Sequence, residues 1–389
     1  MQPAGIEAEI LAWLADRRAE MVTLLEALVN VDSGSHDREG VNRAGEVLAR
    51  FLAEHGLAVE VTPGERQGDG LTVRLPAAGE RNVPGHVLLL GHRDTVFPAG
   101  EAARRPFRVE GERAFGPGVA DMKAGLVMNA FVLAAFAARG GATVPLVMLT
   151  TADEEIASPE GRGLIEATAQ DARCVFNAEP GRPGDGVVTS RNGALFCEVE
   201  ITGRAAHSGA NHQKGASAIE AAARKVQALH ARTDYDRGVT LNVGLIAGGE
   251  AVNTVAPCAR FSFDCRFPRQ VAFAEVEPAI DAILQRTELA GTSQRVASRR
   301  LFLPVEETAR DRKLFDHYAA SAGDVGLPAQ PVFSGGSADS GFTSALGVPT
   351  LCGTGPIGEH AHTPDEVCHL DTLVPRAQAV ALAILRLEA

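Results

Sequence analysis

The spacing of hydrophobic and polar positions changes along this chain. Apolar residues recur at helical intervals over 6–30 and 40–55, and three short apolar runs follow, VLLLG, VPLVMLTTA and RCVFNAE. Helical patterns such as 123–139 and 160–170 separate these runs. Buried runs that alternate with helices are typical of an α/β layer. We therefore expect an α/β fold with a mainly parallel sheet and helices on both faces.

The pattern changes again near residue 189. Three alternating segments, RNGALFCEVEITG, VTLNVGLIAGG and CARFSFDCRFP, read as strands, and 214–231 and 270–287 read as helices. Several strands with two helices predict a small α+β domain inserted into the first one, which closes with a helix over 371–387. The expected bounds are 1–188 and 302–389 for the two parts of the first domain and 189–301 for the insertion.

The composition is that of an ordinary globular protein. The 389 residues allow about two or three domains, of which we expect two, and 45% are hydrophobic and 22% charged. We expect no membrane span, because no apolar run approaches the roughly 18 residues that one requires. The formal net charge of -12 argues against a nucleic-acid partner, which normally needs a basic face.

The amino terminus and the cysteines indicate a reducing compartment. MQPAGIEAEILAWLADRRAEM lacks the basic start and apolar core of a signal peptide, so we expect a cytoplasmic protein. No CxxC pair occurs, which fits neither a disulfide framework nor a thiolate zinc site. We expect all six cysteines to be reduced core residues: Cys174, Cys197, Cys258, Cys265, Cys352 and Cys368.

Imidazole or acidic residues follow each of the three apolar runs, as GHRD, TADEE and NAE. Sites in open α/β sheets lie beyond the carboxyl ends of the strands, so these groups are candidates for chemistry. FGPGVADMKAG adds Asp121 before a helix, where capping of the helix is the alternative role. GEHAHTPDEV adds His360 or His362.

The combined set is two imidazoles and four carboxylates without a thiolate: His92, Asp121, Glu154, Glu155, Glu179 and one of the two late histidines. Such ligands suit zinc, and also cobalt or manganese. If one carboxylate bridges, five ligands can hold two ions about 3.5 to 4 Å apart. One of the adjacent glutamates then remains for proton transfer, and their side chains diverge if the backbone is extended. Asp94 is placed to accept the second ring N–H of His92.

Nine segments, in order, carry a family resemblance: GHRDTVFPAG, FGPGVADMKAG, TADEEIASPEGRGLI, FNAEPG, GRAAHSGAN, GGEAVNTVAP, DCRFP, SGGSADSGF and AHTPDEV. Nearly end to end, the chain resembles the dizinc glutamate carboxypeptidases and their relatives, the aminoacylases, acetylornithine deacetylases and succinyl-diaminopimelate desuccinylases. Glu179 is similar to the carboxypeptidases and several deacylases, whereas dipeptidase and tripeptidase relatives tend to carry Asp there.

The resemblance implies a role for each candidate residue. It assigns the ligands of two zinc ions as follows: His92 and Glu179 to one ion, Glu155 and His362 to the other, and Asp121 to both. Glu154 becomes the general base. His362 is selected over His360 because the family's histidine immediately precedes a Thr, Ser or Gln that leads to an acidic residue, here HTPDE.

The resemblance also implies that the inserted domain is a dimerisation lid, so that the protein is a homodimer. His207 in GRAAHSG would reach the partner's site and polarise the scissile carbonyl. Arg266 would pair with a substrate carboxylate, as a guanidinium fork can. Asn253 and Gly336 would make further substrate contacts.

The expected function is hydrolysis of an amide bond next to a free carboxylate in a small molecule or short peptide, most like a glutamate carboxypeptidase. The alternative is an N-acyl amino acid amidohydrolase of the aminoacylase or deacetylase type. A catalytically dead binding protein is a further alternative, although every expected ligand is present. Neither Ser337 nor Ser340 sits in a G-x-S-x-G elbow, and GPGVAD lacks the third glycine of a dinucleotide fingerprint.

Overall fold

The chain divides into two compact units in the computed structural model, which describes residues 3–80 and 84–387. Within the described residues, the first unit comprises 1–190, 307–334 and 342–389, and the second comprises 191–306 and 335–341. The expected insertion, 189–301, omitted the last of these segments. Residues 335–341 belong to the second unit because Arg191 Nε donates to the Gly336 carbonyl at 2.9 Å and Gly341 lies directly against the Leu303 carbonyl.

The first unit is built on a six-stranded mixed sheet in the order β1-β2-β6-β3-β7-β14. These strands are β1 (Val59–Thr62), β2 (Gly70–Leu75), β3 (His86–His92), β6 (Leu146–Thr151), β7 (Ala172–Asn177) and β14 (Thr350–Leu351). β6, β3, β7 and β14 run parallel, as predicted, whereas β1 and β2 form an antiparallel edge. β3 is buried from Val87 to its end, which accounts for its unbroken apolar run.

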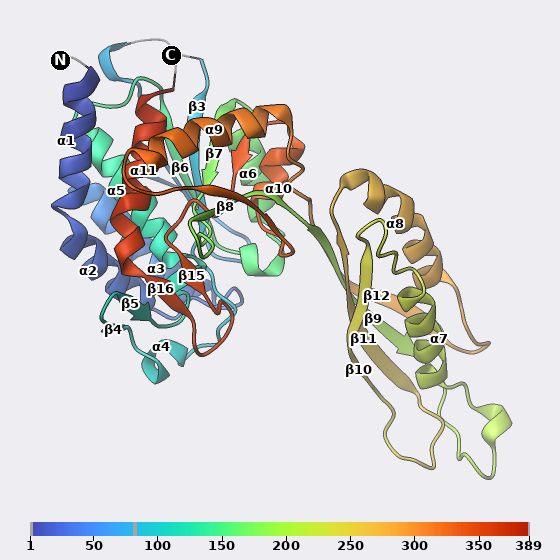
Figure 1. Ribbon diagram of the computed structural model, residues 1–389. Helices are drawn as coiled ribbons and strands as arrows, with labels where there is room; N and C mark the ends of the chain where they lie inside the picture. The colour runs from blue at the N-terminus through green and yellow to red at the C-terminus, as the bar shows by residue number, and fades with distance from the viewer. Residues whose placement is uncertain (1–2, 81–83, 388–389) are drawn as a thin grey trace. The chain divides into compact units, whose positions relative to one another are not determined.

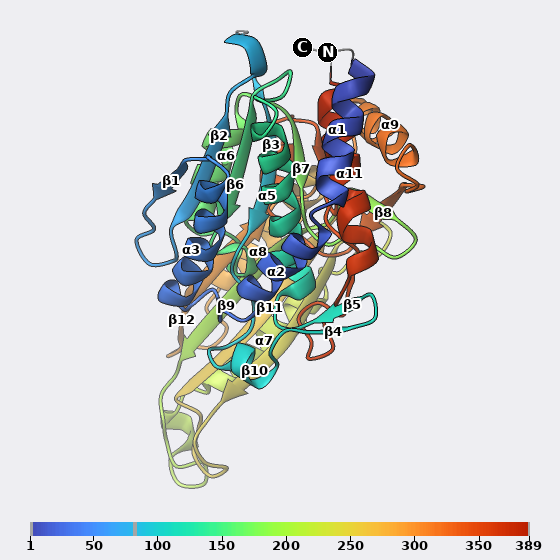
Figure 2. The same ribbon diagram turned by 90° about the vertical axis from the view of Figure 1, so that its left-hand side faces the viewer.

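Helices cover both faces of this sheet (Figures 1 and 2). The helices of the unit are α1 (Pro3–Ala15), α2 (Arg18–Val29), α3 (Arg38–Glu54), α4 (Glu101–Arg104), α5 (Ala124–Ala137), α6 (Gly161–Ala169), α9 (Ala309–Gly323) and α11 (Leu373–Leu385); α10 (Ser340–Ala345) begins in the second unit and ends in the first. α5 packs against β3 and β6, and α1, α2 and α11 pack against α5. The remaining strands are β4 (Arg108–Glu110), β5 (Arg113–Phe115), β8 (Gly186–Arg191), β13 (Gln330–Ser334), β15 (Gly358–Glu359) and β16 (Val367–His369).

The helix predicted over 6–30 is two helices, because the chain turns at Asp16 and Arg17 between α1 and α2. The turn lets Leu14 and Met21 both enter the core. Within the described residues, the stretch Val119–Ala137 is long and apolar enough to cross a membrane, but 94% of it is buried inside the protein. Its apolar character is therefore that of a core helix.

The second unit is a four-stranded antiparallel sheet, β10-β11-β9-β12, with two helices. Its elements are β9 (Gly193–Thr202), β10 (Thr240–Gly248), β11 (Cys258–Phe267), β12 (Ser293–Phe302), α7 (Ala218–His230) and α8 (Gln270–Gln285). Alternate side chains of β11 are buried, as a sheet covered on one face requires. Cys258, at the start of β11, is exposed, so the prediction that all six cysteines are core residues is wrong for this one.

Candidate metal centre

Three neighbouring parallel strands deliver candidate ligands to one edge of the sheet. His92 is the last residue of β3, Glu154 and Glu155 follow β6, and Glu179 follows β7. β3 lies between the other two, with His92 in register with Thr151. The carboxyl ends of parallel strands share an edge, so these residues meet although up to 87 positions separate them.

The predicted ligands form two groups that share Asp121. His92 Nε2 lies 3.3 Å from Asp121 Oδ1 and 3.6 Å from Glu179 Oε1. His362 Nε2 lies 3.3 Å from Asp121 Oδ2 and 3.1 Å from Glu155 Oε2. Each carboxylate oxygen of Asp121 thus faces a different imidazole, which is the arrangement that a bridging ligand needs.

These groups fit metal ions by their chemistry. Each triad offers ligand atoms within 4.8 Å of one another, from His92, Asp121 and Glu179 in one case and from Asp121, Glu155 and His362 in the other. Within the described residues, three buried atoms of these triads have no hydrogen-bond partner of good geometry: His92 Nε2, Asp121 Oδ1 and Glu155 Oε1. Buried polar atoms are normally satisfied, so this concentration of unsatisfied atoms indicates a ligand.

The electrostatics of the cluster demand positive charge. Burial alone would lower the pKa of His92, but the negative charge of Glu154 and the close carboxylates of Asp121, Asp94 and Glu179 hold it well above the usual range. Bonds to Asp121 and Glu155 raise the pKa of His362 to about 11. Burial raises the pKa of Glu155 to about 7, although His362 opposes that shift. Protonated imidazoles therefore balance the carboxylates, and cations can replace these protons.

Asp94 holds three of the site residues, His92, Glu154 and Glu155, in position. His92 Nδ1 lies 3.0 Å from the Asp94 carbonyl oxygen and 3.4 Å from Asp94 Oδ1, so the Nδ1–H donates to Asp94 and Nε2 faces the cluster. The Asp94 carboxylate also accepts the Ser35 hydroxyl at 2.7 Å and the amides of Glu154 and Glu155 at 3.0 Å each. The Nδ1–H of His92 therefore lies closer to the carbonyl oxygen of Asp94 than to the Asp94 carboxylate, which was the predicted acceptor.

The backbone at Glu154 and Glu155 is a single helical turn, Glu154–Ile156, so the condition of an extended backbone is not met, although the two side chains still reach different partners. The Asp94 carboxylate explains the turn, because it binds two successive amides that a strand would point in opposite directions. Glu155 Oε2 still reaches His362, while Glu154 Oε2 lies 3.8 Å from His92 Nε2.

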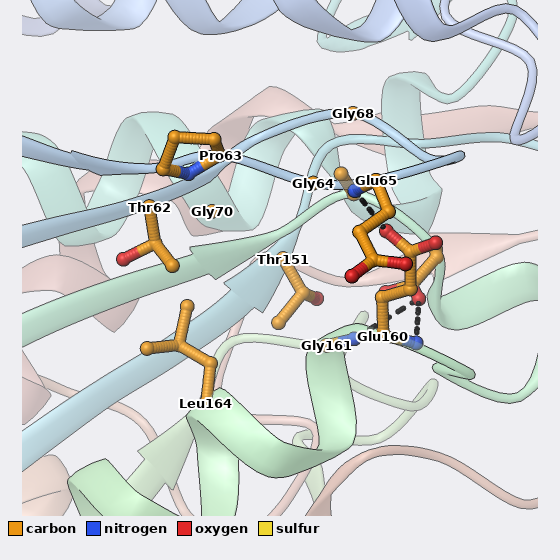
Figure 3. Close-up of a pocket in the computed structure, with 12 residues that line it drawn as sticks. Thr62, Pro63, Gly64, Glu65, Gly68, Gly70, Thr151, Glu160, Gly161 and Leu164 are labelled. Carbon is orange, nitrogen blue, oxygen red and sulfur yellow. Dashed lines mark hydrogen bonds between the residues drawn. The ribbon is translucent and has the colours of Figure 1, made fainter.

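A second carboxylate network surrounds Glu160, at the hollow shown in Figure 3. Asp153 Oδ2 accepts the amides of Glu160 and Gly161 at 2.7 and 3.0 Å, and burial raises the pKa of Asp153 to about 6. The Glu160 carboxylate accepts three successive amides of residues 65–67. Asp153, Glu160 and Gly161 help to line a hollow of about 260 Å³. The bonds of Asp153 also hold in place the turn that begins with Glu154 and Glu155.

Glu366 is a site residue that the sequence did not reveal. It is fully buried, and its carboxylate accepts the amides of Gly118, Ala120 and Asp121 at 2.9 Å each. The alternative role of Asp121 as a helix cap is wrong, because Lys123 precedes α5 and Asp121 lies in the irregular turn before it. Glu366 follows His362 by four positions in AHTPDEV, a spacing that could have drawn attention to it.

Close packing fixes the distance between the Asp121 turn and Glu179. Gly125, in the first turn of α5, lies so close to the Ala178 carbonyl that a Cβ would overlap it.

Arg93, between His92 and Asp94, has a structural role: its buried guanidinium donates to the Thr150 carbonyl at 2.9 Å and to the Asp69 carbonyl. Arg93 therefore ties the end of β3 to the neighbouring strand.

The four predicted residues of the second unit form two pairs. His207 pairs with Thr254 across a bridge, and the Ser208 amide donates to the Asn253 carbonyl at 3.0 Å. Arg266 Nε donates to Asp264 at 2.7 Å, and its Nη1 lies 3.5 Å from Ser337 Oγ, next to Gly336. The structure thus brings His207 beside Asn253 and Arg266 beside Gly336 within this unit.

The fold and the site together define an α/β unit that is interrupted by an α+β unit and carries two groups of candidate metal ligands with one carboxylate in common. Comparison with known families agrees: the sequence profile of Peptidase family M20/M25/M40 matches residues 88–386, and the chain belongs to this family. It is accordingly an enzyme of the metallopeptidase and amidohydrolase class, and its general reaction is hydrolysis of an amide bond.

Similar proteins include two with named activities. Carboxypeptidase G2 of Pseudomonas sp. (strain RS-16) is 28% identical over 381 residues, which is 95% of this chain and 89% of that protein. Acetylornithine deacetylase of Pasteurella multocida is 32% identical over 239 residues, 57% of this chain and 60% of that one. The solved structure of the M20 family metallo-carboxypeptidase Sso-CP2 from Sulfolobus solfataricus superposes with a TM-score of 0.76 at 17% identity, covering 94% of this chain and 99% of that one.

Proposed function

We propose that this protein is a dizinc hydrolase that releases a carboxyl-terminal amino acid such as glutamate from an N-acyl or peptidyl substrate. The observation that carries the proposal is Asp121, whose two oxygens join two triads of zinc-type ligands. The relative named as a carboxypeptidase aligns over nearly the whole chain, which favours this substrate class.

In the proposed site, His92 and Glu179 would hold one ion, Glu155 and His362 would hold the other, and Asp121 would be shared between them. Zinc suits these nitrogen and oxygen ligands, and cobalt or manganese can take its place. When bound, the ions supply the Lewis acidity that activates water and polarises a carbonyl. Asp94 keeps the His92 ring in the tautomer that presents Nε2 to the cluster.

Glu154 is the proposed general base. Its carboxylate lies beside the cluster, 3.8 Å from His92 Nε2, and the residue is 6% exposed. The two triads found among the described residues do not include it, and Asp94 fixes its backbone. It can take a proton from the attacking water and return it to the leaving amine.

The second unit is proposed to bind the substrate and the second subunit of a homodimer. His207 Nδ1 accepts the amides of Gly209 and Ala210 at 3.1 and 3.2 Å, so Nε2 carries the proton and can donate to a carbonyl oxygen. Arg266 would bind the substrate carboxylate, and Gly336 beside Arg266 and Asn253 beside His207 would make further contacts. Strand β10 is a sheet edge whose Leu245 and Ile246 are 70% and 57% exposed, which supports pairing between subunits.

Metal analysis and a substrate panel test the proposal. Protein purified without chelator should contain about two zinc-like ions per chain. It should hydrolyse N-acyl-glutamates and peptidyl-glutamates, lose activity on chelation and regain it with zinc or cobalt. Full activity in a metal-free sample would contradict the proposal.

The second candidate is an N-acyl amino acid amidohydrolase, which the acetylornithine deacetylase relatives favour. Both candidates use the same cluster, so the substrate distinguishes them. A higher kcat/KM for N-acetylornithine than for any glutamate substrate of the panel would select this candidate.

A further inference from the structure

A cavity of about 480 Å³ lies in the first unit, at the edge of the sheet opposite the metal ligands. The starts of the parallel strands β7 and β14 form one wall, and α9 and the end of α11 form the other. Arg173 is the second residue of β7 and Asn177 is its last, so the strand separates the cavity from the metal edge by roughly 13 Å. The cavity is therefore distinct from the proposed reaction centre.

The wall of this cavity is rich in positive charge. Four of its nine lining residues are arginines or lysines, and no aspartate or glutamate of the described chain is among the nine. The whole protein has a formal net charge of -12, so the cavity differs from the average surface. Cys174 remains a neutral thiol, because burial raises its pKa to about 12. The wall thus favours an anion.

Helix α9 presents a basic face to the cavity. Arg310, Lys313 and His317 follow one another at intervals of three and four positions, so they lie on the same side of the helix. Neighbouring like charges destabilise a helix, and so does a cation in the first turn, where Arg310 lies. An anion bound between these side chains would offset both effects.

Two of the cations are available to a ligand. Arg310 Nη1 donates to the Gly347 carbonyl at 2.8 Å, and this neutral acceptor leaves the charge of the guanidinium uncompensated. Lys313 is exposed, and no carboxylate of the described residues forms an ion pair with it. Arg386 differs, because two carboxylates pair with it at 3.0 and 2.6 Å. The charge that can attract a ligand therefore comes mainly from α9.

The cavity also has an apolar part and a preformed wall. Leu314 and Pro349 line it beside the cations. The Val175 amide donates to the Pro349 carbonyl at 2.9 Å, which joins the two strands, and His317 Nε2 donates to the Ala383 carbonyl at 2.7 Å, which joins the two helices. A preformed site loses little conformational entropy when it binds.

We propose that this cavity binds a small organic anion that carries at least two negative charges and an apolar part. Its volume lies within the range of small-molecule sites, about 300 to 1,000 Å³, so it can hold an organic molecule. Arg310 and Lys313 bind the anionic groups, since guanidinium and ammonium groups both bind phosphates and carboxylates. The apolar part lies against Leu314 and Pro349. This site goes beyond the proposed function, because no step of amide hydrolysis uses it.

Calorimetric titration of zinc-loaded protein with four probes tests the proposal, at a pH above the second phosphate pKa of about 6. Phenyl phosphate and phthalate each combine two negative charges with an aromatic ring. Benzoate has one charge, and inorganic phosphate has no apolar part. Phenyl phosphate or phthalate should bind with a Kd below about 1 mM and about tenfold or more tightly than the other two probes. The tighter of the two identifies the ligand as a phosphate ester or a dicarboxylate.

Variants of α9 place the binding in this cavity. Arg310→Ala and Lys313→Ala should each weaken binding of the tighter probe by about tenfold, and Lys313→Arg should retain it. Arg312→Ala is the matched control, because it removes one cation from the same helix, but Arg312 pairs with Glu307 and is not a lining residue. It should leave the Kd unchanged. Lys313 is exposed, so its variants should fold, and urea unfolding checks this.

Three results would each overturn the proposal. The first is a Kd above about 1 mM for both organic dianions. The second is binding of benzoate or inorganic phosphate as tight as that of the dianions. The third is a Kd that neither Arg310→Ala nor Lys313→Ala changes relative to Arg312→Ala, since the probe would then bind elsewhere, for example at the metal ions. None of these results bears on the proposed hydrolysis.

Discussion

At the scale of single residues, Asp121 joins the two halves of the candidate site. Its oxygens face His92 on one side and His362 on the other, and its own amide is held by Glu366. Placement of one carboxylate therefore determines whether both triads can form. Residues that orient Asp121 should influence metal binding without contacting metal.

Glu154→Gln should separate chemistry from metal binding. The variant keeps the shape of the side chain but cannot accept the proton, so turnover should fall by roughly 10²-fold to 10⁴-fold. Metal content, measured by elemental analysis, should stay near normal because Glu154 lies in neither triad of the described residues. Loss of metal instead would mean that Glu154 and Glu155 have exchanged their assigned roles.

Glu366→Gln should weaken metal binding. In wild type, the backbone amides of Gly118, Ala120 and Asp121 donate to the Glu366 carboxylate. A glutamine would replace one of the two acceptor oxygens by an NH₂ group, which is a donor, so the turn that holds Asp121 should loosen. Zinc affinity, titrated with a competing chelator, should fall by about 10-fold to 100-fold. Asp311→Asn is the matched control: this buried carboxylate caps α9 and accepts the Thr350 amide, so its loss should lower stability only. Equal zinc affinities in the two variants would remove the role assigned to Glu366.

The candidate ligands could be predicted from the sequence because they are histidines and carboxylates that directly follow apolar runs. His92 and Glu179 follow directly from strand ends, and the structure brings them to one cluster. Glu366 could not be chosen in this way, since its partners are backbone amides, which have no sequence signature. The turn at Glu154 could not be predicted either, because it depends on the Asp94 carboxylate, 60 positions away.

At the scale of elements, the start of α5 is pressed against the end of β7. Gly125→Ala should force the helix away from the Ala178 carbonyl, next to Glu179, and cost about 1 to 3 kcal/mol of unfolding free energy. Gly163→Ala, in α6, is the control, because open space surrounds Gly163 and alanine favours helix by roughly 1 kcal/mol. Urea unfolding measures both changes, and a Gly125→Ala protein as stable as wild type would contradict the packing argument.

Long periodic elements could be predicted and short ones could not. The patterns over 40–55 and 270–287 correspond to α3 and α8, because a helix that buries one face leaves a clear period. Strands such as β14 and β15 are two residues long, and pairing with distant partners defines them. Local sequence contains too little of that information.

At the scale of the whole molecule, the second unit allows a test of a shared active site. If each subunit lends His207 to its partner, an inactive His207→Ala protein and an inactive Glu154→Gln protein should complement each other after subunit exchange. Random exchange makes about half of the dimers mixed, each with one competent site of two, so activity should approach about a quarter of wild type.

Light scattering and exchange of labelled subunits provide the controls for that experiment. An active wild-type monomer, or proven exchange without recovery of activity, would show that His207 does not act on a partner.

The insertion itself was visible in the sequence because its strands alternate whereas those of the first unit do not. Its return segment, 335–341, was missed, since Arg191 and Gly336 meet across 145 positions of chain. Local patterns therefore predict an α/β unit with an α+β insertion, but the bounds of the two units depend on contacts that form only in the folded chain.

The order of the ligands along the chain has a consequence for biosynthesis. His92, Asp121, Glu155 and Glu179 are translated early, whereas His362 and Glu366 follow only after the entire second unit has been made. A nascent chain that ends before residue 362 lacks one ligand of the His362 triad and the carboxylate that orders the Asp121 turn. Domains generally fold as units during synthesis, so full occupancy of the proposed centre should mark a chain whose translation has passed Glu366.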